Sequence, residues 1–435
     1  MAATHRDKER PVNVNAFEKT LLPNGLRVVT APMPQAKSVA CFLMMAAGSR
    51  YETRDTNGIA HFAEHMFFKG TENRPTARVL STEIDSIGGE FNAFTGKEYT
   101  GYYVKCAAEH RDVALDVLVD MIRRSKFDPE EIEREKGVIV EEMNMYFDTP
   151  RDYVDGVYDR LLYGDQPLGW DIIGTKDTVR AATRETFQSY LDHWYRAHRI
   201  VAGVAGQVGK DVVARLEELL GDVQDGTTGT PPPVAVSQSA PRVKLHTKAS
   251  DQAHLRLGVH SYPLDHPDRY NLALLATVLG GGMSSRLFSE VRERRGLAYY
   301  IFGHNQAYTD AGTLFAQGGV DLNRIDEAVT TIVREFSRIA SERVSDEELG
   351  KARNFAKGRF VLSLEDPKGL ILFALRSEVL EERLREPDEV LAGYDAVVAE
   401  DVQRVAQDII RDERLNLAII GPFDEPARFE KLLAL

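Results

Sequence analysis

The fold of this chain is organised around a stretch near its midpoint, Gln224-Asp225-Gly226-Thr227-Thr228-Gly229-Thr230-Pro231-Pro232-Pro233. Glycine and threonine followed by a proline run cannot form a packed core and are typical of a linker. With 435 residues, the chain exceeds one typical hydrophobic core, so two or more domains are expected. We therefore predict an N-terminal domain over residues 1–223, a linker over 224–234 and a C-terminal domain over 235–435.

The two predicted domains share a faint internal repeat. Each begins with alternating strands, over 26–29 and 39–45 in the first and over 243–246 and 254–259 in the second. A helix, further strands and an apolar-periodic helix follow, the last over 107–125 and over 324–340. The sequence thus predicts an α+β fold of two homologous domains from an internal duplication. Each domain is expected to be a mostly antiparallel sheet with helices packed on one face.

The strongest echo between the halves is a pair of helix starts. Residues 127–132 read Phe-Asp-Pro-Glu-Glu-Ile, and residues 344–349 read Val-Ser-Asp-Glu-Glu-Leu. Asp128 is a good N-cap, Pro129 suits the first helical position, and Glu131 would complete a capping box. Ser345 and Glu348 would do the same in the second half.

Composition excludes several classes of partner. A net charge of -13 argues against nucleic acid and against an anionic membrane surface. No run of 18 apolar residues is present, and residues 1–11 lack the apolar core of a secretory signal. Cys41 and Cys106 are two isolated cysteines in strand-like runs, which indicates buried thiols in a reducing compartment.

The strongest chemical signal is His61-Phe62-Ala63-Glu64-His65. On a helix, residues four apart share a face, so both imidazoles can bind one divalent metal, most plausibly zinc. Glu64 would stand beside the metal, placed to take a proton from water. The order His-x-x-Glu-His is called an inverzincin pattern. The alternative is an amphipathic helix whose histidines are ordinary polar groups.

A third ligand is usual in a catalytic zinc site, and the helix that opens at Pro129 offers candidates. Glu135 and Glu142 are seven residues apart and share a helix face whose surroundings are otherwise apolar. A carboxylate on an inward face needs a partner, which a metal would provide. The alternative is a solvated acidic face. In the repeat, Arg359 occupies the position equivalent to Glu142, and the second half has no histidine motif.

These residues resemble the pitrilysin/insulinase-like inverzincin zinc peptidases, in their processing-peptidase branch. That family pairs His-x-x-Glu-His with a glutamate 77 positions after the last histidine and another seven before it, as Glu142 and Glu135 stand here. The resemblance covers roughly residues 15 to 430. It implies one zinc ion per chain held by His61, His65 and Glu142. It also implies that Glu64 is the general base and that Glu135 supports the site.

A substrate strand is implied by the same resemblance. Residues 89–95 and 100–104 are predicted to form a hairpin with a turn at Gly96-Lys97. In the family, a strand matching Asn92, Ala93, Phe94 and Thr95 forms a sheet edge near the metal, where an extended peptide pairs as an added strand. An ordinary sheet is the alternative. Phe68 is a candidate pocket residue, although a core position suits it better.

Two segments of the second half remain. Residues 280–287, Gly-Gly-Gly-Met-Ser-Ser-Arg-Leu, lack the Gly-Lys-Ser/Thr ending of a phosphate loop, so we expect a closely packed helix entry and no nucleotide site. Arg292 and Tyr299 match the family's arginine and tyrosine pair, which grips substrate and stabilises the oxyanion. Five of the histidines outside the motif, His193, His198, His254, His260 and His304, are expected to be structural or at the surface.

Function and assembly follow from the resemblance. Relatives of full length have four such domains closed around a chamber, so a two-domain chain implies a homodimer, with a heterodimer as the alternative. The expected activity is zinc-dependent endopeptidase cleavage of unfolded or presequence-like peptides, with no nucleic-acid or membrane partner. A catalytic subunit that needs a heterologous partner, and a non-cleaving peptide-binding or structural subunit, are the competing functions. A bacterial-type cytoplasm is the expected location, with the mitochondrial matrix as the alternative.

Overall fold

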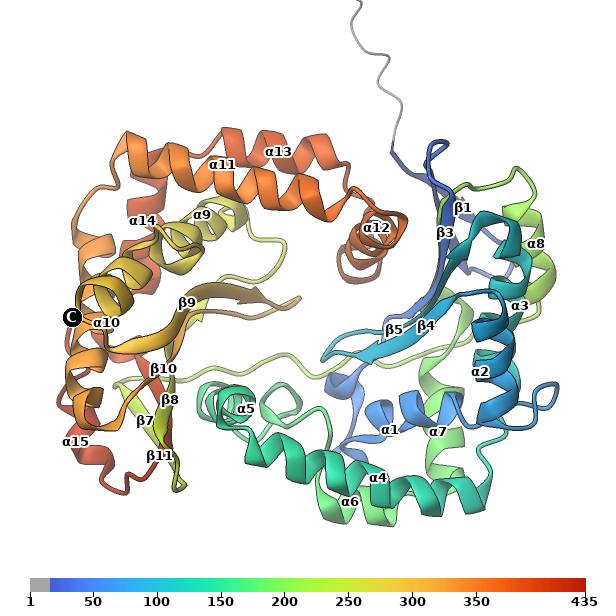
Figure 1. The fold of residues 1–435 in the computed structure, drawn as a ribbon, viewed down its shortest axis with the longest axis horizontal. Coiled ribbons are helices and arrows are strands. Elements are labelled where there is room, and N and C mark those ends of the chain that lie inside the picture. Colours follow the sequence, from blue (N-terminus) through green and yellow to red (C-terminus); the bar gives the residue numbers. More distant parts are fainter. Residues whose placement is uncertain (1–15) are drawn as a thin grey trace, which may run out of the picture.

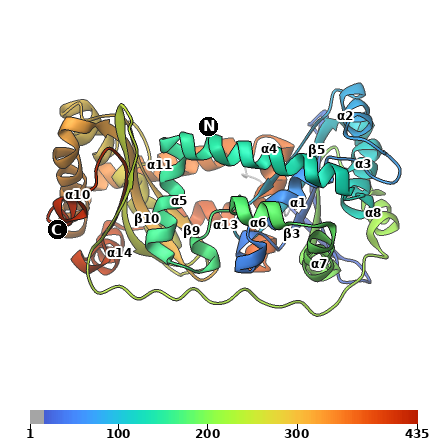
Figure 2. The ribbon, with the colours of Figure 1, turned by 90° about the horizontal axis from the view of Figure 1, so that it is seen from below.

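The computed structural model describes residues 16–435, which form two halves joined by an extended segment (Figure 1). The prediction about a secretory signal concerns residues 1–11 and lies outside this range. Residues 223–238 contain neither helix nor strand, and Figure 2 shows this segment running along one side of the molecule between the halves. We call residues 16–222 the N-terminal half and residues 239–435 the C-terminal half.

The N-terminal half contains a six-stranded sheet in the order β1-β2-β6-β3-β5-β4. Its strands are β1 (Glu18–Leu21), β2 (Arg27–Pro32), β3 (Ser38–Met45), β4 (Glu90–Thr95), β5 (Thr100–Ala107) and β6 (Ile200–Gly206). Its helices are α1 (Ile59–Phe67), α2 (Ala77–Ser86), α3 (Arg111–Arg124), α4 (Pro129–Asp148), α5 (Pro150–Tyr163), α6 (Lys176–Ala181), α7 (Arg184–Trp194) and α8 (Val212–Leu220).

The C-terminal half contains a five-stranded sheet in the order β7-β11-β8-β10-β9. Its strands are β7 (Arg242–Thr247), β8 (Gln252–Ser261), β9 (Ala298–Ala307), β10 (Gly312–Asp321) and β11 (Asn416–Gly421). Its helices are α9 (Arg269–Gly280), a π-helix (Phe288–Arg294), α10 (Ile325–Ser341), α11 (Asp346–Ser363), α12 (Pro367–Glu381), α13 (Pro387–Asp395), α14 (Ala399–Ile409) and α15 (Pro426–Glu430).

The two sheets repeat one topology, which confirms the predicted duplication and α+β class. In each, one parallel pair, β2 with β6 or β7 with β11, is followed by antiparallel pairings to the far edge. The strand β1 adds to the first sheet and has no counterpart in the second. Each half packs its own helices on one sheet face, where the two largest apolar clusters lie.

The opposite face of each sheet is covered by a helix from the other half, which the sequence did not indicate (Figure 1). The α12 residues Ile371 and Leu375 pack on the strands β2, β3 and β6. The α5 residues Val154 and Tyr158 pack on β8 and β11 of the second sheet. Because each half completes the core of the other, the space between them is bounded by both.

Helix caps were predicted correctly in part. Asp128 accepts the Glu130 N–H at 2.9 Å, and Ser345 accepts the Glu348 N–H at 3.1 Å, so α4 and α11 begin as predicted. The second hydrogen bond of each predicted capping box, from the N-cap N–H to the glutamate side chain, is wrong. The carboxylate of Glu348 pairs instead with Arg286. Glu131 is likewise paired with Arg134.

Candidate metal centre

The helix α1 presents the histidine motif on its open face. Six buried apolar residues anchor the helix in the first core: Ile59, Ala60, Phe62, Ala63, Met66 and Phe67. His61 and His65, one turn apart, place their ring centroids 4.7 Å from each other. The amphipathic pattern therefore fixes the direction in which both imidazoles point.

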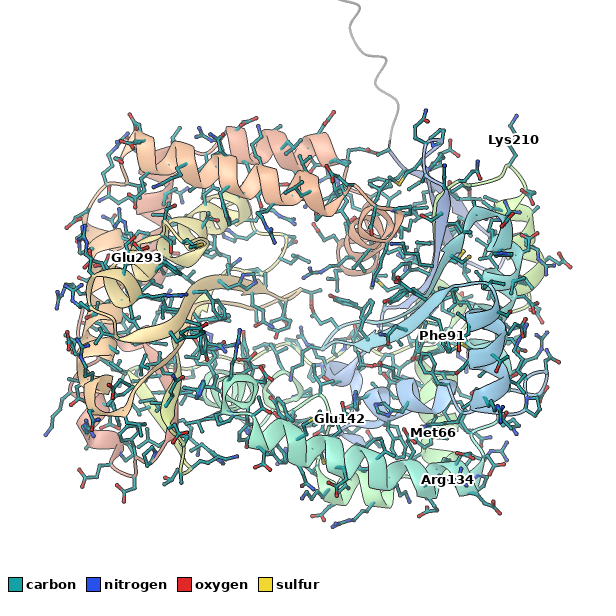
Figure 3. The ribbon with its side chains drawn as sticks, in the orientation of Figure 1. Met66, Phe91, Arg134, Glu142, Lys210 and Glu293 are labelled. Carbon is teal, nitrogen blue, oxygen red and sulfur yellow. The ribbon has the colours of Figure 1, made fainter. Side chains whose placement is uncertain are left out.

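The helix α4 brings Glu142 to these two imidazoles. Its Oε1 lies 3.6 Å from Nε2 of His61, and its Oε2 lies 3.4 Å from Nε2 of His65. Figure 3 places Glu142 toward the middle of the molecule and Arg134 of the same helix at the periphery. One ligand atom from each of the three side chains lies within 4.8 Å of the others. The structure thus joins the three predicted ligands from two helices.

The chemistry of this donor set fits a zinc ion. Glu142 Oε2 and His61 Nδ1 are buried atoms without a hydrogen-bond partner among the described residues, and a buried carboxylate oxygen needs a cation or a donor. Burial, and then the neighbouring His65, lower the pKa of His61 to about 3, so this imidazole is neutral, the form that binds metal. Two imidazole nitrogens and one carboxylate, with a fourth position left for water, are a zinc ligand set.

Glu135 lies one layer behind the ligands. Its Oε1 is 2.9 Å from Nδ1 of His65, and its Oε2 is 2.5 Å from Nζ of Lys69. Burial alone would raise the pKa of Glu135, but hydrogen bonds from His65 and Lys69 lower it overall. An ionised Glu135 fixes the proton of His65 on Nδ1 and leaves Nε2 free to face Glu142. Glu135 thus lies where the predicted supporting role requires it.

Glu64 lies on the same helix but outside the ligand cluster. Its Oε2 accepts a 2.5 Å hydrogen bond from the hydroxyl of Thr95, at the end of β4. Burial raises the pKa of Glu64, and the bond from Thr95 lowers it by less. A carboxylate with a raised pKa beside a metal site suits proton transfer.

The predicted substrate strand is β4. It forms one edge of the first sheet, because within residues 16–435 it pairs with β5 alone. Asn92 is exposed, and its side chain accepts the N–H of Ala93. Phe94 packs over Gly101, and Phe68 packs against Phe91 with ring centroids 5.3 Å apart. The turn between β4 and β5 spans Gly96 to Tyr99, wider than predicted. Of the four strand residues, Thr95 hydrogen-bonds to Glu64.

A cavity of about 780 Å³ opens beside the ligands and is bounded by both halves. The N-terminal half contributes His61, Glu142, the β4–β5 turn and several aspartates, including Asp152 and Asp155 of α5. The C-terminal half contributes six residues: Arg256, Gln306, Ala307, Tyr308, Arg376 and Leu380. Side chains from both halves could therefore contact anything bound next to the metal ligands.

Arg292 and Tyr299 lie together, but they do not line this cavity. The guanidinium of Arg292 is 5.3 Å from the centroid of the Tyr299 ring, and Tyr299 is 76% exposed. Glu293, the neighbour of Arg292, lies toward the outer side of the C-terminal half, whereas Glu142 lies toward the middle of the molecule (Figure 3). The pair is thus separated from the ligands of its own chain.

Other predicted features of the second half and the cysteines lie away from the ligands. Gly280 ends α9 so close to β9 that a Cβ would meet the Gly303 nitrogen at 2.0 Å, which explains the glycine by close packing. Cys41 and Cys106 are buried free thiols. The five histidines that we expect to be structural or at the surface lie outside the ligand cluster. One of them, His254, contacts the Tyr300 hydroxyl at 2.9 Å.

Sequence reasoning missed three residues near the site. Lys69 stands four positions after His65, a spacing that could have indicated it. Glu52 caps α1 from outside the helix, and Arg50 ties the same segment to the other half. Neither has a local sequence signal beyond a charged residue in a short connection.

Fold and site together define a class: a duplicated α+β chain with a His-His-Glu metal site built by two helices of its first half. The model of the insulinase family (peptidase family M16) matches residues 27–176, and the model of the peptidase M16 inactive domain matches residues 181–355. The chain belongs to peptidase family M16.

Similar proteins span the same length. The uncharacterized zinc protease YmxG of Bacillus subtilis is 36% identical, over 92% of this chain and 97% of that protein. An uncharacterized zinc protease of Streptomyces coelicolor is 35% identical, over 95% of this chain and 91% of its own. The crystal structure of a protease from Helicobacter pylori has a TM-score of 0.87 at 22% identity and covers 94% of this chain and all of that one, which shows a shared fold.

Proposed function

We propose that this chain is a zinc-dependent endopeptidase that hydrolyses unfolded peptides. The observation that carries this proposal is the convergence of the side chains of His61, His65 and Glu142. One carboxylate oxygen of Glu142 is buried without a hydrogen-bond partner among the described residues, and Glu64 lies on the same helix as the two histidines. Zinc, when bound by these three side chains, polarises a scissile carbonyl and lowers the pKa of water from about 16 towards about 7. The relatives named zinc proteases support the choice of metal.

The residues around the metal site divide the remaining work. Glu64 takes the proton of the attacking water and returns it to the leaving amine. The free edge of β4 binds the peptide as an added strand, so most contacts are to its backbone and sequence preference is loose. Residues Asn92 to Thr95 form that edge, and the hydroxyl of Thr95 also holds Glu64.

Arg292 and Tyr299 complete the site from a second subunit in this proposal. They are distant from the ligands of their own chain, yet they are paired and accessible. In the proposed homodimer, the Arg292 and Tyr299 of each subunit would lie next to the metal site of the other subunit. There they would stabilise the oxyanion, at about 3 kcal/mol per donor. The enclosed space would admit flexible peptides and presequence-like segments, and exclude folded proteins.

The proposed setting is the cytoplasm of a bacterium, with the mitochondrial matrix as the alternative. The relatives named above are bacterial. None of the helices in residues 16–435 combines the length and apolar composition needed to cross a bilayer.

The deciding experiment is digestion of mixed unfolded peptides of about 10–40 residues, read by mass spectrometry. Wild type is compared with Glu64→Gln at equal zinc loading, because this change removes the base and keeps the ligands. Cleavage by wild type alone is the expected result. Failure of both to cleave, with zinc bound, would contradict the proposal and favour a missing partner subunit or a peptide-binding role.

A further inference from the structure

The helix α1, which carries His61 and His65 and is called the zinc helix below, begins after a residue whose side chain cannot cap it. Its N-cap is Gly58, with a φ of 96° and no side chain to accept a hydrogen bond. The first N–H groups of a helix have no partner within the helix, so they need an acceptor from elsewhere. His61 is only the third residue of α1, so the metal ligand stands within this first turn.

Close packing explains why the cap is a glycine. A Cβ on Gly58 would lie 2.7 Å from the carbonyl oxygen of Ile173, and a Cβ on Gly174 would lie 2.4 Å from the Asn57 carbonyl oxygen. Ser, Thr, Asp or Asn, the usual N-caps, therefore cannot occupy position 58. The capping group has to come from another part of the chain.

Glu52 is that group. Its Oε2 accepts the N–H of Gly58 at 2.8 Å and the side-chain amide of Asn57 at 3.0 Å, while its Oε1 accepts the N–H of Ala60 at 2.8 Å. The residue is 5% exposed. Burial raises the pKa of Glu52 to about 8, although all three partners are donors that favour the ionised form and so limit the rise. A carboxylate at a helix N-terminus also interacts favourably with the helix dipole.

We propose that Glu52 is a positioning residue for the metal site, because it fixes the N-terminal turn of α1 and thereby the place of His61 relative to His65 and Glu142. Within residues 16–435, the hydrogen bonds of Glu52 go to Asn57, Gly58 and Ala60 and to none of the metal ligands, so Glu52 acts through the helix backbone. Ala60, whose N–H it binds, is adjacent to His61. This inference rests on the proposed zinc function, and it assigns part of the metal affinity to a residue outside the motif.

The test compares zinc affinity of Glu52→Gln and wild type by competition with a chromogenic chelator. The amide keeps the size of the side chain, but it turns one acceptor oxygen into a donor that faces an N–H. We expect the zinc dissociation constant to rise about tenfold, at the lower end of what outer residues of metal sites contribute. Amide exchange of residues 58–62 in the zinc-free protein should accelerate in the same variant.

Asp366→Asn is the matched control. Asp366 caps α12 through the N–H of Gly369 at 2.6 Å, on the other side of the molecule's interior, so its change should leave zinc affinity as in wild type. If Glu52→Gln does not fold, Asn57→Ala removes one of the three donors, and the dissociation constant should rise by a smaller factor.

Three outcomes separate the inference from the proposed function. An unchanged zinc affinity in Glu52→Gln would overturn the inference and leave the proposed function standing. If Glu52→Gln does not fold, an unchanged zinc affinity in Asn57→Ala would do the same. Zinc affinity lowered equally in Asp366→Asn would also overturn it, because the effect would then be one of general stability. A wild-type chain that binds no zinc would overturn both.

Discussion

The hydroxyl of Thr95 donates a 2.5 Å hydrogen bond to Oε2 of Glu64, and so joins the end of the edge strand β4 to the zinc helix α1. Thr95 belongs to the strand on which we propose that substrate pairs, and Glu64 is the proposed base. One carboxylate oxygen is thereby held, and in the proposed reaction the other takes the proton of the water. A peptide that pairs with β4 would be placed in register with the base.

Removal of this hydroxyl should lower turnover without loss of metal. Thr95→Val keeps the β-branched shape but cannot donate, and a hydrogen bond to a charged group contributes about 1.5–3 kcal/mol. We expect kcat to fall at least about tenfold, measured with a quenched-fluorescence peptide at equal zinc content. Thr95→Ser retains the donor and serves as the control. Equal activity of the Val and wild-type proteins would show that Glu64 needs no such support.

Mixed dimers should show whether the site is shared between subunits. Glu64→Gln lacks the base, and Tyr299→Phe lacks the proposed oxyanion donor, so each homodimer should have little activity. Random pairing of equal amounts makes about half of the dimers mixed, each with one intact site. We expect about a quarter of wild-type activity after the two proteins are unfolded and refolded together. A mixture that never exceeds its parents would show that the site is not shared between subunits.

The stability of the zinc-free protein should fall as pH drops below about 6.5. A histidine in the unfolded chain has a pKa of about 6.5. In the folded protein, burial and the neighbouring His65 lower the pKa of His61 to about 3. Below pH 6.5 the unfolded chain therefore binds more protons than the folded chain, which favours unfolding until the pH approaches 3. The contribution at pH 5 is up to about 2 kcal/mol.

Urea unfolding at pH 7 and pH 5, with a chelator present, measures this effect. His61→Asn has no titrating group at this position, so it should lose less stability between the two pH values than wild type. Identical losses would mean that His61 is not buried as a neutral imidazole in the zinc-free protein.

Arg50 should be essential for holding the halves together. It is 2% exposed and binds Glu98 at 2.6 Å in the β4–β5 turn and Asp310 at 2.5 Å in the C-terminal half. It also donates to the carbonyl of Pro232 in the connecting segment. Arg50→Met leaves the buried carboxylate of Glu98 and the partly exposed one of Asp310 without this cation. Loss of the partner of a buried charge typically costs about 3–5 kcal/mol.

Arg134→Met is the control for Arg50, because it breaks the pair of Arg134 with Glu131 at a surface where Arg134 is 64% exposed. Exposed pairs of this kind contribute less than about 1 kcal/mol. Urea unfolding should therefore separate the two variants by several kcal/mol. Similar losses would show that the contacts of Arg50 do not stabilise the assembly of the halves.

Much of the fold could be predicted from local patterns. The caps Asp128 and Ser345 mark the starts of α4 and α11 because a side-chain acceptor next to a helix start is a local property. The repeat predicted two similar sheets because each half had to bury alternating apolar strands. The sequence could not predict that α5 and α12 each pack on the sheet of the other half. The apolar side chains of either helix could be buried against any apolar sheet face.

The sequence by itself determined the placement of His61 and His65 on one helix face, because the spacing of four residues and the helical period suffice for that. It also placed Glu135 and Glu142 on one face of α4. Only the tertiary structure decided that Glu142 meets both imidazoles, that Thr95 holds Glu64 and that Glu52 caps α1. The physical reason is that these contacts join segments that no backbone period relates, and their distances depend on how helices and strands pack around the shared core.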